Sequence, residues 1–242
     1  MKNKLGTAAA AAIMAIGLAS AASADSRTYA WTYDYTTAPA GMAEIEYYST
    51  SKVPDTSAPE VNSWEHQLEL EYGLTKRTDM ALYQMFRQDG TAAGSTFSYE
   101  GMKLRLRHRL ADKGALPLDT LFYLEYSRGS DLAKSEELEG KLVLGKDFGR
   151  LNLTYNQVAE MKLDGEKELE HGYSAGAAWA LSDRFSVGAE STGSYSESEY
   201  YFGPTLHFQE QSMKFFANLG FLKGLNSKSD DARTRLLIGV PF

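Results

Sequence analysis

The sequence predicts an all-β protein, an antiparallel up-and-down transmembrane β-barrel of about twelve strands. Three observations predict it. Apolar and polar residues alternate over segments of about ten residues, turn-forming residues separate these segments, and no apolar run of about 18 residues follows the first two dozen positions. The mean hydropathy of -0.38 excludes a bundle of transmembrane helices. It does not exclude a barrel, because only every second residue of a barrel strand meets lipid.

The composition is that of a folded chain. Of 242 residues, 43% are hydrophobic and 24% are charged, and no cysteine is present. A disordered chain and a small domain held by disulfides are therefore both excluded.

Residues 1–24 have the features of a cleaved signal peptide. Lys2 and Lys4 precede an Ala-rich apolar stretch, and Ala22-Ser23-Ala24 supplies the small residues of a cleavage site before Asp25. Without this peptide the chain has 23 basic and 32 acidic side chains, a formal charge of -9. So acidic a chain is not expected to bind nucleic acid.

Residues 25–41 form an N-terminal aromatic segment ahead of the barrel, which is predicted over 42–242. Tyr29, Trp31, Tyr33 and Tyr35 alternate there, yet a thirteenth strand would break an even strand count. The segment is expected to fold into the periplasmic mouth as a plug or to lie as an aromatic collar at the membrane interface. A stacking site for sugars is a further alternative.

Two of the predicted strands have strongly charged polar faces. Segment 64–73 alternates apolar residues with acidic or amide residues, and segment 97–110 alternates leucines with basic residues. No packed helix places four acids at a spacing of two on one face, so these segments are strands. In chain order the twelve strands are expected at 42–50, 64–73, 79–88, 97–110, 119–128, 136–146, 151–159, 168–180, 185–193, 200–209, 213–223 and 232–242.

The later segments repeat the alternation, and only one earlier segment is ambiguous. Segment 79–88 is apolar on both faces, so ten or fourteen strands stay open. Apolar faces of the later strands include Leu138, Leu142 and Leu144; Leu151, Leu153 and Tyr155; Tyr173, Ala175, Ala177 and Trp179; Phe185, Val187 and Ala189; Phe202, Pro204, Leu206 and Phe208; Phe215, Ala217, Leu219 and Phe221; and Leu236, Ile238, Val240 and Phe242.

The links between these segments alternate in length. Tight links are predicted at 74–78, 147–150, 181–184 and 210–212, with 111–118 somewhat longer, and these would face the periplasm. Longer polar links at 51–63, 89–96, 129–135, 160–167, 194–199 and 224–231 would face the exterior. A soluble β-sandwich is the alternative, but the expected strands match the length that crosses a bilayer rather than the roughly 5–6 residues of globular strands.

These features resemble the small outer-membrane β-barrels of Gram-negative bacteria, an uncharacterised porin-like group. The resemblance rests on the signal peptide, turns such as Leu181-Ser182-Asp183-Arg184-Phe185 and a final alternating strand that ends at Phe242. It implies that Phe242 is the signal read by the barrel-assembly machinery, and that outer-membrane lipids and lipopolysaccharide surround the barrel. An inward basic ladder is expected at Lys103, Arg105, Arg107 and Arg109, and it is similar to that of twelve-stranded channels for oligogalacturonate-type sugars.

With the apolar faces toward lipid, charged residues line the lumen. A basic ladder and an acidic wall are expected there: Lys103, Arg105, Arg107 and Arg109, and Glu44, Glu46, Glu65, Glu69 and Glu71. In one interpretation the ladder pairs with Asp119, Glu125 and acids across a narrow lumen, which fills the interior. In the other, the two groups face each other across water and the ladder attracts anions. Small or polar inward residues such as Asn152, Asn156 and Gly176 leave room inside and favour the second.

The predicted function is therefore passive diffusion of small polar or anionic solutes across the outer membrane. An occluded structural or adhesive barrel without transport is the first alternative, and a lipid-modifying enzyme is the second. No enzyme, cofactor or metal site is expected, because none of the four histidines has a serine two residues on and no spacing resembles a zinc site. The histidines are His66, His108 and His171, expected on the lipid side, and His207, expected inside.

Overall fold

The computed structural model describes residues 27–133, 136–163, 168–210 and 214–242. The predicted signal peptide, residues 1–24, lies outside the described residues. No helix in these ranges is long and apolar enough to cross a membrane.

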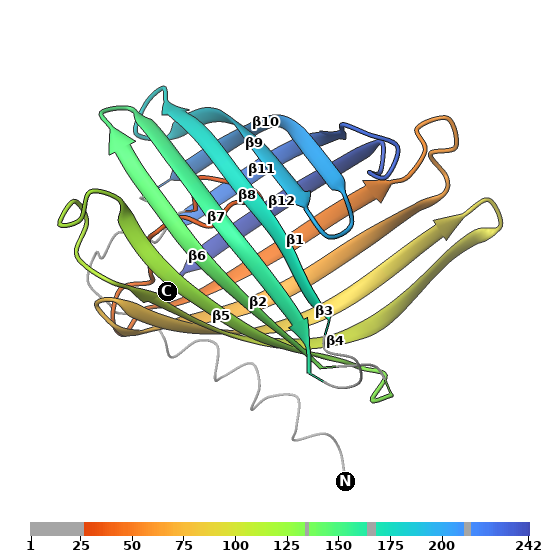
Figure 1. Ribbon diagram of the computed structural model, residues 1–242, viewed down its shortest axis with the longest axis horizontal. Coiled ribbons are helices and arrows are strands. Elements are labelled where there is room, and N and C mark those ends of the chain that lie inside the picture. The colour runs from red at the N-terminus through yellow and green to blue at the C-terminus, as the bar shows by residue number, and fades with distance from the viewer. Residues whose placement is uncertain (1–26, 134–135, 164–167, 211–213) are drawn as a thin grey trace, which may run out of the picture.

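Twelve antiparallel strands form one closed barrel, which confirms the predicted fold (Figure 1). Each strand pairs with its neighbours in sequence, and β1 pairs with β12 to close the barrel. The strands are β1 Ala43–Val53, β2 Asn62–Thr75, β3 Thr78–Thr91, β4 Gly94–Arg109, β5 Asp119–Gly129, β6 Glu137–Phe148, β7 Leu151–Lys162, β8 Leu169–Ala180, β9 Phe185–Ser194, β10 Glu199–Glu210, β11 Phe215–Gly224 and β12 Ala232–Pro241.

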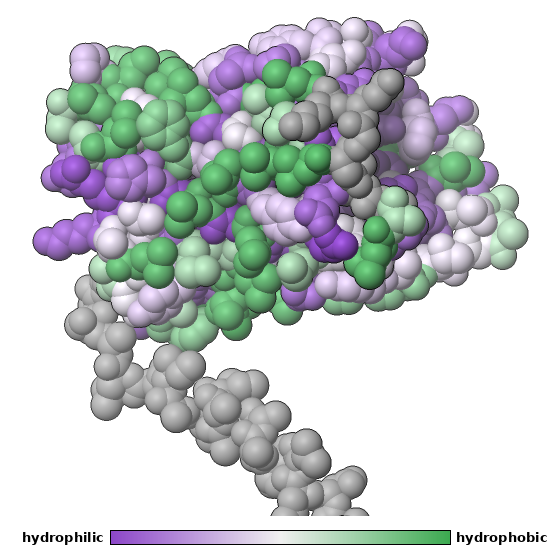
Figure 2. Space-filling model, turned by 60° about the horizontal axis from the view of Figure 1, so that its bottom comes forward, coloured by the Kyte–Doolittle hydropathy of each residue, from purple (hydrophilic) through white to green (hydrophobic). Residues whose placement is uncertain are grey.

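The alternation of each strand separates an apolar outside from an inside that is largely polar. On β2, for example, Leu68 and Leu70 are each 48% exposed, whereas Glu69 between them is fully buried. Apolar side chains accordingly cover much of the outer wall seen in Figure 2. An outer wall of this kind fits lipid, because a folded chain in water would bury those leucines.

The two rims of the barrel differ. We call the rim at which β1 begins and β12 ends the terminal rim, and the opposite one the distal rim. At the terminal rim the chain's last residue closes the seam, since the Phe242 amide donates to the Ala43 carbonyl at 2.8 Å and the Ala43 amide donates back at 3.3 Å. The C-terminal aromatic is thus part of the ladder that joins β1 to β12.

The connections follow the predicted rhythm with three exceptions. The link between β3 and β4 at the distal rim is only residues 92–93, because both strands continue as a paired hairpin through the region expected to be a loop. The link 110–118 at the terminal rim is longer than any of the distal ones, and the distal link 195–198 is no longer than the terminal link 181–184. Polar residues at a strand end therefore do not mark a loop when a partner strand extends beside them.

Candidate functional site

Residues 27–41 lie inside the barrel as a re-entrant segment that we call the plug. It turns back on itself near Trp31 and returns to the terminal rim, where β1 begins. Tyr29, Ala30 and Thr32 have no exposed surface, and Tyr33 is only 9% exposed. The described part of the aromatic segment 25–41 therefore lies within the lumen and not as a collar, and residues 25–26 are outside the described residues.

A buried glutamate of β9 holds the turn of the plug. One carboxylate oxygen of Glu190 accepts the Ala30 amide, and the other accepts the amides of Trp31 and Thr32, all at 2.8 Å. Glu190 itself is fully buried. Three backbone donors on one carboxylate compensate for the loss of its hydration, because charge-assisted hydrogen bonds are about twice as strong as neutral ones.

Two asparagines bind the backbone on either side of the turn. Asn156 accepts the Tyr33 amide at 2.7 Å and donates to the Tyr33 carbonyl at 2.9 Å. Asn218 donates to the carbonyls of Arg27 at 2.7 Å and Tyr29 at 3.1 Å. The barrel wall thus satisfies much of the plug's buried backbone with side chains rather than with a strand partner.

Glycines in the wall make sockets for the aromatic rings of the plug. A Cβ atom at Gly145 would lie 2.2 Å from the Tyr35 ring, and one at Gly176 would lie 2.4 Å from the Tyr29 ring. At Gly220 it would lie 2.1 Å from the Trp31 ring. Only glycine permits these contacts, so Gly176, one of the small inward residues that favoured a channel, accommodates the plug instead.

The predicted basic ladder points inward, but its central residues are buried in ion pairs. Arg105 and Arg107 are each 2% exposed. Arg105 pairs with Glu69 at 2.7 Å and also with Glu71, and Arg107 lies 2.6 Å from Glu71. Asp79 lies 2.7 Å from Arg107. We call these five side chains the buried ion network.

The strand register explains how acids of β2 meet cations of β4. Ala81 of β3 lies opposite Glu71 on one side and opposite Arg105 on the other. Because the Ala81 side chain is short, the side chains of Glu71 and Arg105 can form an ion pair above it. Asp79 is the direct partner of Arg107 in the same register.

The ends of the ladder have other partners. Lys103 pairs with Glu125 of β5 at 2.8 Å, as one interpretation of the sequence proposed. Arg109 donates to the Thr37 hydroxyl of the plug at 3.0 Å. Asp119, the other expected partner on β5, instead accepts the Gly114 amide at 2.6 Å.

The remaining residues of the acidic wall also point inward. Glu44 is 4% exposed and Glu46 is 1% exposed, and Glu46 accepts a hydrogen bond from Tyr48. Glu65, nearer the distal rim, pairs with Lys52. The acidic wall and the basic ladder are therefore not opposite walls of a water-filled gap, because β2 and β4 flank the same strand and their charges neutralise one another.

Water-accessible space lies at both ends of the plug. Toward the distal rim are cavities of about 610 Å³ and 300 Å³, which share Glu139 and Glu160 and which we call together the outer vestibule. Trp31 of the plug lines the smaller one. A cavity of about 240 Å³ at the terminal rim, lined by Thr28, Tyr35 and others, shares no lining residue with the vestibule.

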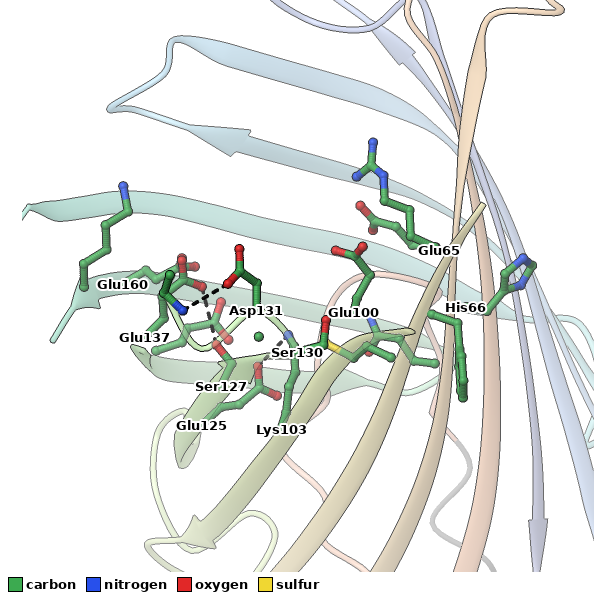
Figure 3. Close-up of a pocket in the computed structure, with 18 residues that line it drawn as sticks. Glu65, His66, Glu100, Lys103, Glu125, Ser127, Ser130, Asp131, Glu137 and Glu160 are labelled. Atoms are coloured by element: carbon green, nitrogen blue, oxygen red, sulfur yellow. Dashed lines mark hydrogen bonds and ion pairs between the residues drawn. The ribbon is translucent and has the colours of Figure 1, made fainter. Parts of the chain in front are cut away.

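The outer vestibule has an excess of acidic residues. Figure 3 shows Lys103, Glu125 and Glu137 facing its larger cavity from one side and Glu65 from another. Among the described lining residues of both cavities, five are basic and nine are acidic: Arg87, Lys103, Lys141, Lys162 and Arg233 against Glu65, Glu100, Glu125, Asp131, Glu137, Glu139, Glu160, Glu170 and Glu199. Acidic side chains therefore outnumber basic ones by four in the outer vestibule.

The histidines occupy the expected faces. His66, His108 and His171 lie on the outward alternation, and His66 stacks between Tyr47 and Trp64. His207 points inward, is 5% exposed and shares a 2.6 Å hydrogen bond with Asn218. Among the described residues, no three His, Asp or Glu side chains are arranged to hold a metal ion.

Sequence reasoning missed Glu190, Asn218 and the buried position of Asp79. Glu190 and Asn218 lie on the polar alternation of otherwise small or apolar strands, as single polar residues without a pattern. One sequence feature could have indicated the plug: segment 25–41 has four alternating aromatic residues, and three distant strands have inward glycines that can accommodate aromatic rings.

Comparisons with known proteins identify the fold. No protein-family model and no curated protein matches this sequence. Among solved structures, the chain is similar to a NanC porin, with a TM-score of 0.55 and 8% identity over 81% of this chain and 97% of that one. It also matches the translocator domain of the autotransporter NalP from Neisseria meningitidis, with a TM-score of 0.45 and 13% identity over 83% and 87% of the two chains. The fold is that of outer-membrane β-barrels.

Proposed function

We propose that this protein is an outer-membrane channel for small polar solutes, closed at rest by its own plug. The terminal rim faces the periplasm in this proposal and the outer vestibule faces the exterior. The observation that supports it most directly is that residues 27–41 lie in the lumen. Hydrogen bonds between their backbone and the side chains of Glu190, Asn156 and Asn218 hold them there. A segment held in this way can leave as a unit while the strand ladder stays intact, as locally opening segments do.

The preference for anions expected from the ladder is not part of this proposal. Arg105 and Arg107 are buried and neutralised by Glu69, Glu71 and Asp79, so they present no net positive charge to a solute. A solute from outside first meets the acidic vestibule.

The glycine sockets allow a direct test. In Gly176→Ala/Gly220→Ala the added methyl groups would lie 2.4 Å and 2.1 Å from the Tyr29 and Trp31 rings, so the plug is expected to leave the lumen. The barrel should assemble normally, because alanine suits a strand at least as well as glycine. Planar-bilayer recordings should show this variant open most of the time, and the wild-type chain closed with rare openings of the same unit conductance.

Gly140→Ala is the matched control, since a Cβ atom there meets only a carbonyl oxygen at 4.0 Å. It should behave as wild type. A wild-type chain that never opens, beside an open double variant, would support the permanently occluded barrel instead. A wild-type chain that is open continuously would contradict closure by the plug.

Acidification is expected to lower the open probability. Asp34 of the plug, which precedes the first strand, is 4% exposed, and burial raises its pKa to about 6. In a released plug this carboxyl titrates near about 3.9. The closed state therefore takes up a proton as the pH falls through about 6, which favours closure below that pH and not above it. Recordings at pH 5 and pH 7 should show this dependence in wild type and not in Asp34→Asn.

A further inference from the structure

A row of four acidic residues crosses the wall of the outer vestibule. Glu125 of β5 lies directly opposite Glu139 of β6, Glu139 lies opposite Glu160 of β7, and Glu160 lies opposite Glu170 of β8. Neighbouring strands are about 4.8 Å apart, so the row extends over about 14 Å. Like charges directly opposite each other destabilise a sheet, and here the arrangement occurs three times in succession.

Basic residues compensate this row only in part. Lys103 lies 2.8 Å from Glu125, Lys141 lies 2.8 Å from Glu139, and Lys162 lies 3.6 Å from Glu170 and 3.5 Å from Glu168. Glu160, in the middle, has no basic side chain within ion-pair distance among the described residues. The row thus contains one carboxyl group more than it has paired lysines, and this group lies where both cavities of the vestibule meet.

The low-dielectric barrel wall strengthens the field of these charges. A cleft lined by one sign of charge concentrates counter-ions, and the effect weakens as salt is added. Trp31 of the plug lines the cavity that contains Glu139, Glu160 and Glu170, so ions gathered there lie above the closed turn.

We infer that the outer vestibule selects small cationic solutes, and that Glu160 and Glu170 are residues that determine this selection. The inference deepens the proposed channel function and rests on it for the passage of the solute, but the accumulation of cations in the vestibule does not depend on whether the plug opens.

Quenching of Trp31 fluorescence tests the accumulation without any opening. The full chain carrying Trp64→Phe and Trp179→Phe retains Trp31 as its single tryptophan, because the chain has three and the two replaced ones face outward. Caesium and iodide serve as cationic and anionic quenchers at pH 8.5 and low ionic strength, each scaled to its quenching of free N-acetyltryptophanamide. The scaled caesium constant is expected to exceed that of iodide by about threefold or more, from one uncompensated carboxylate charge on the wall of the same cavity.

Glu160→Gln/Glu170→Gln is the test variant, and Glu60→Gln/Glu197→Gln is the control, which removes the same charge from exposed loops at the distal rim. The caesium-to-iodide ratio should fall toward one in the test variant and stay unchanged in the control. Equal scaled constants in the parent, or a ratio that the test variant leaves unchanged, would overturn the inference.

A second measurement addresses passage. Gly176→Ala/Gly220→Ala recorded in asymmetric KCl should give a reversal potential of cation-selective sign, and adding Glu160→Gln/Glu170→Gln should move it toward zero. An anion-selective potential would overturn the inference. A wild-type chain that never opens would overturn the proposed gating, while the quenching result would still decide the selection of cations.

Discussion

Arg105→Met is expected to lower the free energy of unfolding by about 3–5 kcal/mol or to prevent assembly, because it leaves buried acids without their cation. Arg105 joins Glu69, Glu71 and Asp79, and the side chains of Arg105, Glu69 and Asp79 have no exposed surface. Methionine fills a similar volume and brings no charge. The loss is measured by urea titration of the protein folded into lipid vesicles and by the gel shift between its folded and heated forms.

Arg87→Met is the matched control for this prediction. Arg87 also lies in the barrel wall and pairs with Asp89 at 2.8 Å, but the two side chains are 38% and 44% exposed. Such a pair contributes about 1 kcal/mol or less. Adding Glu69→Gln and Glu71→Gln to Arg105→Met should recover part of the loss, since the uncompensated charge is then smaller. Equal stability of the Arg105 and Arg87 variants would show that the network is not a source of stability.

Glu190→Gln is expected to release the plug while the barrel stays folded. The amide has one acceptor oxygen in place of two and turns an N–H group toward backbone N–H donors of Ala30–Thr32. Losing charge-assisted bonds of this kind costs on the order of 3 kcal/mol, which corresponds to about a hundredfold rise in the ratio of open to closed channel. Open probability in planar bilayers measures the effect, and urea titration should show little change.

Glu197→Gln removes the same charge from the exposed link between β9 and β10, so it controls for net charge. Its open probability should match wild type. If Glu190→Gln also stays closed, the plug is held by its aromatic rings, and Tyr33 and Tyr35 against Leu121, Tyr123 and Val143 become the principal contacts.

The barrel could be predicted because its signal is local. The alternation of apolar and polar residues can be recognised within about ten consecutive residues of a strand. The twelve strands can therefore be predicted from the sequence, and so can the inward direction of Lys103, Arg105, Arg107 and Arg109. Even the ambiguous segment 79–88 is a strand, β3, whose inward Asp79 belongs to the buried ion network and whose inward Ala81 lies between Glu71 and Arg105.

The sequence offered the plug and the ion pairs only as alternatives, and it could not decide between them because they depend on contacts between distant strands. That Glu71 reaches Arg105 follows from the register of three strands and the shortness of Ala81, and neither is visible in one strand alone. From their inward positions on the strands alone, Gly176 and Asn156 are consistent with a lumen that contains only water. Only the placement of Tyr29 and Tyr33 shows that these residues hold a peptide.

The plug's contacts also constrain the order in which the protein can be built. Residues 27–32 precede the barrel in the chain, yet they bind Glu190 of β9, Asn218 of β11 and Arg235 of β12. One of these bonds joins residues 191 positions apart. Contacts between residues so far apart in the chain form late, because the entropic cost of closing such a long loop is first reduced by pairing between neighbouring strands. The plug can therefore take its final position only after β9, β11 and β12 are in place, so closure of the lumen is expected to be among the last steps of assembly.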